Sequence, residues 1–148
     1  MNEVQFISDL AFNMVNGLSD YRSAGLDAFY KAFDKDFPHG DELSKRMELV
    51  FAKIAGLRPA AIRDTIFFRI PLFFTLFLIL DSVRAQIPND ILEDALFAID
   101  KAFNSDTPLS ERNEADAQFY LACTASTQRI KSRGIRDQYV RMFLQLPK

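Results

Sequence analysis

The stretch Ile70-Pro-Leu-Phe-Phe-Thr-Leu-Phe-Leu-Ile-Leu80 is the longest apolar run in the chain and decides its fold. Its length is about half of the roughly 20 residues that a helix needs to cross a bilayer, and Arg69 and Asp81 close it on both sides. Pro71 suits the first turn of a helix, and the residues after it leave no polar face. We therefore expect a buried helix over about Leu72 to Leu80, surrounded by other helices.

The rest of the chain repeats its apolar residues with the helical period of 3.6 and lacks the alternation of strands. The pattern predicts six more helices: about 2–16 with a stop at Gly17, one after Ser23, 41–55 with a stop at Gly56, one after Pro88, one from a cap at Ser110, and about 127–146 with Gly134 as a possible break. We expect a turn at 59–64. No repeat or linker divides the chain, so the predicted fold is all-α, a single multi-helix domain over residues 1–148.

The composition is typical of a globular protein, with 49% hydrophobic and 26% charged residues. A chain of 148 residues can bury a core without a disulfide or a structural metal. Its single cysteine, Cys123, excludes an internal disulfide framework and a cysteine-based zinc site. The opening residues Met1-Asn2-Glu3 are not basic, unlike the start of a signal peptide. We expect a cytoplasmic protein with no membrane segment.

Metal chemistry has little support in the sequence. His39 is the only histidine, which excludes a histidine-rich metal site, and we interpret it as a solvated turn residue. The acidic stretch 34–42 hints at a calcium loop, but the fifth position of that loop is Pro38 and the twelfth is Lys45 instead of Glu. The sequence therefore predicts no metal site.

The remaining candidates for catalysis are better explained as structural or surface residues. Cys123 lies among apolar residues with no histidine to activate it, which favours a buried thiol over a nucleophile. Glu93, Asp94 and Asp100 are interpreted as a charged helix face without the supporting groups of an acid/base pair. We expect no catalytic residue, no cofactor and no enzymatic activity of the chain on its own.

Charge is distributed unevenly along the chain. Residues 124–148 carry 6 Lys/Arg and 1 Asp/Glu, which leaves 12 and 19 of the totals of 18 and 20 for residues 1–123. The net charges are thus +5 and −7. At 100° per residue Arg129, Arg133 and Arg136 fall on one side of the last helix, so the helix can dock on the core and present a row of guanidinium groups. Such a row favours a phosphate-bearing or acidic partner.

Hydroxyl groups precede this helix. Thr124, Ser126 and Thr127 offer caps and hydrogen-bond donors, so anion contact through the helix N-terminus is also feasible. The candidate nucleic-acid-binding residues are therefore Arg129, Arg133, Arg136, Thr124 and Ser126. The alternative, of at least equal weight from charge alone, is that the arginines pair with the acidic body of the chain.

Several stretches resemble the helical C-terminal half of the GmrSD-like restriction proteins, a family of prokaryotic defence proteins. They are Phe6-Ile-Ser-Asp-Leu10, Gly17-Leu-Ser-Asp-Tyr-Arg22, Phe29-Tyr30 with Phe37-Pro38, Arg63-Asp-Thr65, Leu72-Phe-Phe-Thr-Leu-Phe77, and Phe119 with Thr124, Ser126, Arg129 and Arg133. The resemblance spans nearly the whole chain, through loose motifs.

The resemblance implies a non-catalytic helical accessory domain or subunit in antiviral defence. In this family the N-terminal half has a ParB-like nucleotide-hydrolysing fold, and an HNH nuclease is often a domain or partner. The chain contains neither the Asp-Gly-Gln-Gln-Arg string of the ParB-like half nor the HNH histidines. The implied partners are a ParB-like or HNH nuclease polypeptide or domain and, through the basic helix, DNA. The alternative function is a protein-interaction or regulatory module with no nucleic-acid contact.

Overall fold

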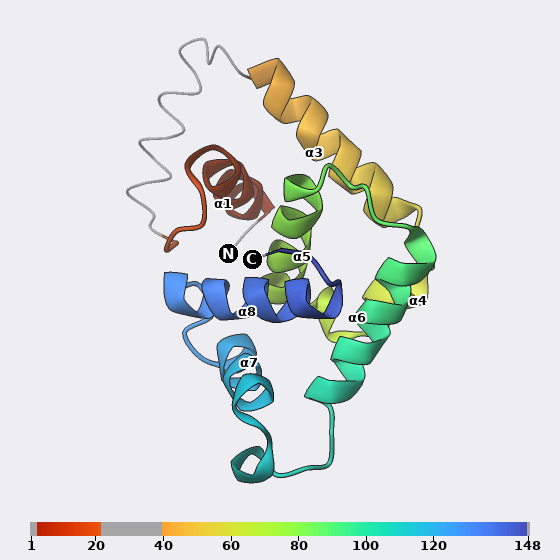
Figure 1. Ribbon diagram of the computed structural model, residues 1–148. Helices are drawn as coiled ribbons and strands as arrows, with labels where there is room; N and C mark the ends of the chain where they lie inside the picture. The colour runs from red at the N-terminus through yellow and green to blue at the C-terminus, as the bar shows by residue number, and fades with distance from the viewer. Residues whose placement is uncertain (1–2, 22–39, 148) are drawn as a thin grey trace.

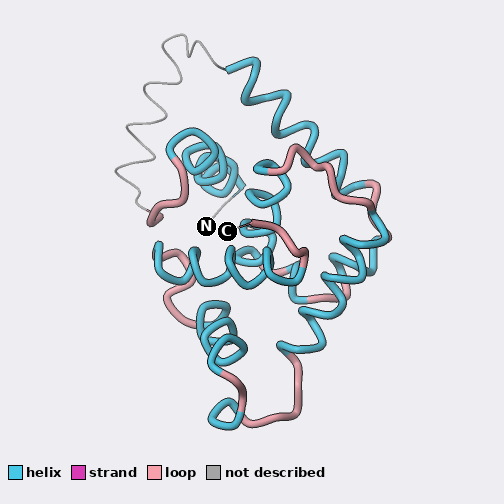
Figure 2. Tube along the Cα trace, in the orientation of Figure 1, coloured by secondary structure: helices cyan, strands magenta, loops and turns pink. Residues whose placement is uncertain are grey.

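The computed structural model describes residues 3–21 and 40–147, and within them every regular element is a helix (Figures 1 and 2). In chain order the elements are α1 (Glu3–Asn16), α3 (Gly40–Ala55), α4 (Pro59–Arg63), η1 (Ile66–Phe68), α5 (Ile70–Ser82), α6 (Asn89–Phe103), η2 (Leu109–Glu111), α7 (Glu114–Thr124) and α8 (Ile130–Phe143). The predicted all-α class is confirmed. The helix expected after Ser23, and His39, lie outside the described residues.

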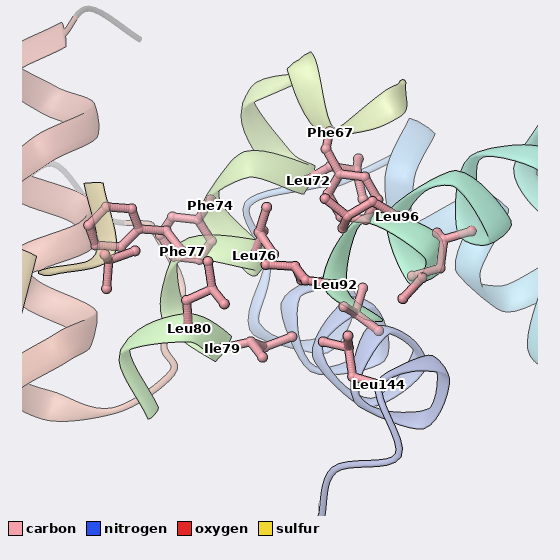
Figure 3. Close-up of a cluster of buried hydrophobic side chains, with 14 of the residues drawn as sticks. Phe67, Leu72, Phe74, Leu76, Phe77, Ile79, Leu80, Leu92, Leu96 and Leu144 are labelled. Carbon is pink, nitrogen blue, oxygen red and sulfur yellow. The ribbon is translucent and has the colours of Figure 1, made fainter. Parts of the chain in front are cut away.

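Helix α5 is the centre of the fold. Helices α1, α3, α8 and η1 pack against it, and Figure 1 shows it between α1 and α6. Seven of its residues are buried: Leu72, Phe74, Thr75, Leu76, Phe77, Ile79 and Leu80. The six apolar ones form one cluster with Phe67 of η1 and with Leu92 and Leu96 of α6 (Figure 3). The expectation of a buried central helix is confirmed.

Helices α6, α7 and α8 form the other side of the molecule. Helix α7 packs against α8 and α6. The Phe119 ring of α7 stacks on the Tyr139 ring of α8 with a centroid separation of 3.9 Å. The Tyr139 hydroxyl donates a hydrogen bond to Asp116 Oδ1 at 2.8 Å, which satisfies its one polar group. These contacts hold α7 against α8.

Two local expectations are wrong. The segment 59–64 holds the short helix α4, because Pro59 occupies the first helical turn, where its missing N–H has no partner to lose. Helix α7 begins at Glu114, and its cap is Asn113, whose Oδ1 accepts a hydrogen bond from the Asp116 N–H at 2.8 Å. Ser110, the expected cap, lies inside η2.

Helix α8 is shorter than expected and unbroken. It starts at Ile130 and runs through Gly134 without interruption. The side chains of Arg133 and Arg136, on either side of this glycine, are both anchored in the interior, which holds the helical backbone in place. No helix in the described part of the chain is long and apolar enough to span a membrane.

Replacing Phe77 with alanine is expected to lower the free energy of unfolding by about 3–5 kcal/mol. Phe77 is fully buried, and its ring contacts that of Phe51 edge to face at 4.9 Å, so truncation leaves a cavity. The matched control is Phe68→Ala, because Phe68 is 70% exposed and should lose about 0.5 kcal/mol or less. Chemical denaturation measures both. Equal small losses would contradict the central position of α5.

Candidate functional site

The first half of α8 carries the three arginines that the sequence singled out. Arg129 is exposed and precedes the helix as its N-cap residue, without a side-chain cap. Arg133 and Arg136 are only 2% and 1% exposed. The predicted outward row of guanidinium groups is therefore wrong for two of its three members, and the alternative of pairing inside the chain holds for Arg133.

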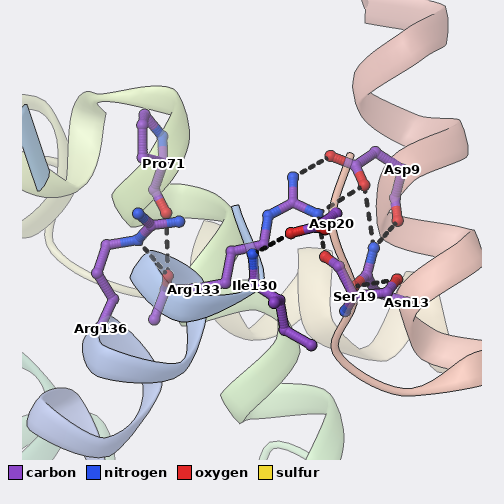
Figure 4. A network of polar contacts seen from close by, with 9 residues as sticks. Asp9, Asn13, Ser19, Asp20, Pro71, Ile130, Arg133 and Arg136 are labelled. Atoms are coloured by element: carbon purple, nitrogen blue, oxygen red, sulfur yellow. Dashed lines mark hydrogen bonds and ion pairs between the residues drawn. The ribbon is translucent and has the colours of Figure 1, made fainter. Parts of the chain in front are cut away.

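Arg133 forms a buried ion pair with Asp9 of α1 (Figure 4). Its Nη1 and Nη2 donate to the two carboxylate oxygens of Asp9 at 3.1 and 2.6 Å, a bidentate geometry. Nη1 also donates to the Ser19 carbonyl at 2.8 Å, and the guanidinium lies over the Phe74 ring, 4.1 Å from its centroid. The pair thus joins α1, the segment after it, α5 and α8.

The segment after α1 continues this network. Asn13 Nδ2 donates to Asp9 Oδ1 at 3.0 Å, and Asn13 Oδ1 accepts from the Ser19 N–H at 2.8 Å. Asp20 Oδ1 accepts a hydrogen bond from the Ile130 N–H, at the first turn of α8. Asp20 therefore supplies the partner that the unsatisfied helix start needs, in place of a local cap.

Among the residues that the structure describes, buried Arg136 has no carboxylate partner. Its Nε donates to Thr75 Oγ1 at 3.0 Å, and its Nη1 donates to the Ala122 carbonyl at 2.6 Å. The Thr75 hydroxyl in turn donates to the Pro71 carbonyl at 3.0 Å. Burial lowers the pKa of Arg136 to about 10, because removal from water disfavours its charged form. At neutral pH the residue is still a cation.

The two hydroxyl candidates stand apart from this network. Thr124 and Ser126 are exposed. The Thr124 hydroxyl donates to the Tyr120 carbonyl at 2.9 Å, within its own helix. Ser126 has a positive φ of 49°, and its carbonyl accepts from the Arg129 N–H at 3.1 Å. The expectation that these hydroxyls cap α8 is wrong.

A cleft of about 200 Å³ opens beside the buried arginines. Asp9, Arg133 and Arg136 line it together with side chains of α1, α5 and the segment before α8. One carboxylate faces two guanidinium groups here, so the groups on the cleft wall carry an excess positive charge.

The other candidates from the sequence have structural roles. Cys123 is buried, as expected, and burial raises the pKa of its thiol to about 12, which disfavours the thiolate. Glu93 is buried and accepts from the Arg58 backbone N–H at 2.6 Å, so its interpretation as part of a charged surface is wrong. Asp100 accepts from the Ile66 N–H at 2.8 Å, and Asp94 is exposed.

Within residues 3–21 and 40–147 no cluster of His, Cys, Asp and Glu is suited to hold a metal.

Sequence reasoning gave no role to Asp9 and Asn13, which anchor the network on α1. Their spacing of four residues places both on one side of the helix, beside the buried side chains of Leu10 and Met14. A polar pair on the inward side of an apolar helix needs a buried partner. The Asp9 and Asn13 spacing could therefore have indicated a buried polar contact on α1, but it does not identify Arg133 as the partner.

Comparison of the chain with models of known protein families, with curated proteins and with solved structures finds no match.

Replacing Arg133 with alanine is expected to lower the free energy of unfolding by about 3–5 kcal/mol, because the Asp9 carboxylate is left buried without its counter-ion. Arg129→Ala is the matched control: it removes the same side chain from an exposed position and should change stability by about 0.5 kcal/mol or less. Urea denaturation of both variants measures the difference. Similar small losses would contradict a structural role for Arg133.

Proposed function

We propose that this chain is a non-catalytic helical accessory module of a prokaryotic defence-associated restriction protein, and that it acts through contacts with a protein partner. The proposal rests on the resemblance described above and on one structural observation. Stretches that carry the resemblance, distant in sequence, meet at the buried Asp9–Arg133 ion pair: Asp9 comes from the first, Ser19 from the second, Phe74 from the fifth and Arg133 from the last.

This convergence supports an architectural role for the shared residues. A buried ion pair that links α1 to α8 holds a particular arrangement of helices, and removing one partner is costly. Side chains used in this way are not available to bind a phosphate backbone. The same residues that suggested a nucleic-acid surface therefore support a scaffold, whose ParB-like or HNH nuclease partner supplies the chemistry.

The exposed charges favour a protein partner over DNA. Of the basic residues in 124–147, Arg133 and Arg136 are buried and Arg141 pairs with Asp137 at 3.0 Å. Arg129 and Lys131 are the exposed ones in that range. Two cations on an acidic body give a weak electrostatic attraction for a polyanion.

DNA contact is the second candidate function, and the exposure of Arg129, Lys131, Thr124 and Ser126 near the start of α8 favours it. With two cations the log-affinity against log-salt slope should be no steeper than about −1.8, at about 0.9 for each phosphate contact. A row of three arginines would give about −2.7. Fluorescence anisotropy with a duplex of random sequence measures the slope.

We expect the double variant Arg129→Ala/Lys131→Ala to keep its fold and lose whatever DNA binding the chain has, because both side chains are exposed. The matched control, Arg141→Ala, removes a cation that is already paired with Asp137. If the double variant still binds DNA, or if the slope is near −2.7, then Arg129 and Lys131 are not the two residues that contact DNA.

The main proposal predicts a complex with a ParB-like or HNH nuclease polypeptide of the same genome, fused or separate. The complex should persist in high salt and in the presence of heparin, since contact between protein surfaces depends less on screened charge than a phosphate contact does. Analytical ultracentrifugation of the purified pair, with wild-type chain and with Arg129→Ala/Lys131→Ala, measures it. A complex that forms with neither class of polypeptide, or one that heparin displaces, would contradict the proposal.

A further inference from the structure

Arg136 is a buried cation whose hydrogen bonds go to neutral groups. Its partners are the Thr75 hydroxyl and the Ala122 carbonyl, and its Nη2 has no hydrogen-bond partner among the described residues. A buried charge is costly unless it is paired, and the protein keeps this one 1% exposed. An anion at Nη2 would supply the missing charge and the missing acceptor.

The neighbouring charges do not supply that anion. Asp9 is the carboxylate on the cleft wall, and its two oxygens already receive hydrogen bonds from Arg133 and Asn13. Cys123 lies near Arg136, but burial raises the pKa of its thiol to about 12, so it is neutral at physiological pH. Arg133 Nε also lacks a partner, but this atom is shielded from the cleft, so Arg136 is the arginine that can meet a ligand.

The cleft offers space and further donors next to Arg136. It measures about 200 Å³, and Thr127 and Gln128 form part of its wall. Neither the Thr127 hydroxyl nor the Gln128 side-chain amide makes a hydrogen bond to another described residue. The lining also has an apolar part, which includes Phe6, Ile70 and Phe74. A guanidinium, a hydroxyl and an amide around a small cavity are donors suited to one oxyanion.

We propose that this cleft is a binding site for a single small oxyanion, a phosphate or a carboxylate group, held by Arg136 with Thr127 and Gln128. The site is distinct from the exposed surface at Arg129 and does not depend on the proposed function. The bound group neutralises the excess cation between α1, α5 and α8 and stabilises their junction. The ligand is either a free anion or the acidic end of a larger molecule, since the chemistry of recognition is the same.

The test is isothermal titration calorimetry of the full chain with inorganic phosphate and, separately, with acetate, at constant ionic strength and pH 7. Saturable binding of one anion per chain supports the site, and the anion that binds identifies the class of group. Binding should also raise the midpoint of thermal unfolding, because the ligand binds the folded state. If neither anion binds, the proposal is overturned.

Variants locate the site. Arg136→Met should weaken anion binding at least about tenfold, because a charged hydrogen-bond donor is lost. Gln128→Glu tests the same cleft without altering the core: it places a carboxylate at the exposed edge of the cleft and should compete with the ligand to a similar degree. Gln138→Glu is the matched control: it makes the same change at an exposed position on α8 that does not line the cleft, and should leave binding unchanged. Equal binding by the wild type and Gln128→Glu would overturn the proposal, even if Arg136→Met does not fold.

Discussion

A carboxylate and a guanidinium that are both shielded from water connect two helices 124 residues apart in the sequence. Burying two charges is expensive, and the cost is offset here by a bidentate geometry together with hydrogen bonds from Asn13 to Asp9 and from Arg133 to the Ser19 carbonyl. Helix α1 carries Asp9 and Asn13 on its buried side, so its place beside α5 depends on Arg133. If that contact is lost, the packing of Leu10 and Met14 is opposed by the cost of burying an unpaired Asp9 carboxylate.

Helix α8 also supplies a hydrogen-bond donor to the one polar side chain of the apolar run in α5. Thr75 is the one polar residue between Ile70 and Leu80, and its hydroxyl accepts a hydrogen bond from Arg136 while it donates to Pro71. An otherwise apolar helix can therefore be crossed by a helix rich in arginine without unsatisfied groups on α5. The described residues do not neutralise the positive charge of Arg136. Because Arg136 also lines a cleft, its charge is open to a ligand, which distinguishes it from a purely structural arginine.

Periodicity was enough to predict α1, α3 and α6, since each has an apolar pattern ended by glycine or preceded by proline. The unbroken apolar run with Pro71 in its first turn was enough to predict α5. Periodicity failed at the start of α7, where Ser110 and Asn113 are both good caps and the η2 turn decides between them. For α8, the spacing correctly groups Arg133 and Arg136 on one side, but it does not tell that this side is inward or that Arg129 precedes the helix. The apolar residues of α8 do not mark its buried side either, since Tyr139 is buried and Met142 is 56% exposed. The choice depends on Asp9, a partner that no local pattern reveals.

The central claim is that Asp9 and Arg133 stabilise the fold as a pair, and a double-mutant cycle with Asp9→Asn and Arg133→Met tests it most directly. Urea denaturation gives the free energy of unfolding of the wild type, the two single variants and the double variant. We expect a coupling energy of about 1–3 kcal/mol. The double variant should be more stable than Arg133→Met alone, because it removes the charge that the single variant leaves unpaired. Strictly additive losses would contradict the account, since they would mean that the two side chains contribute independently.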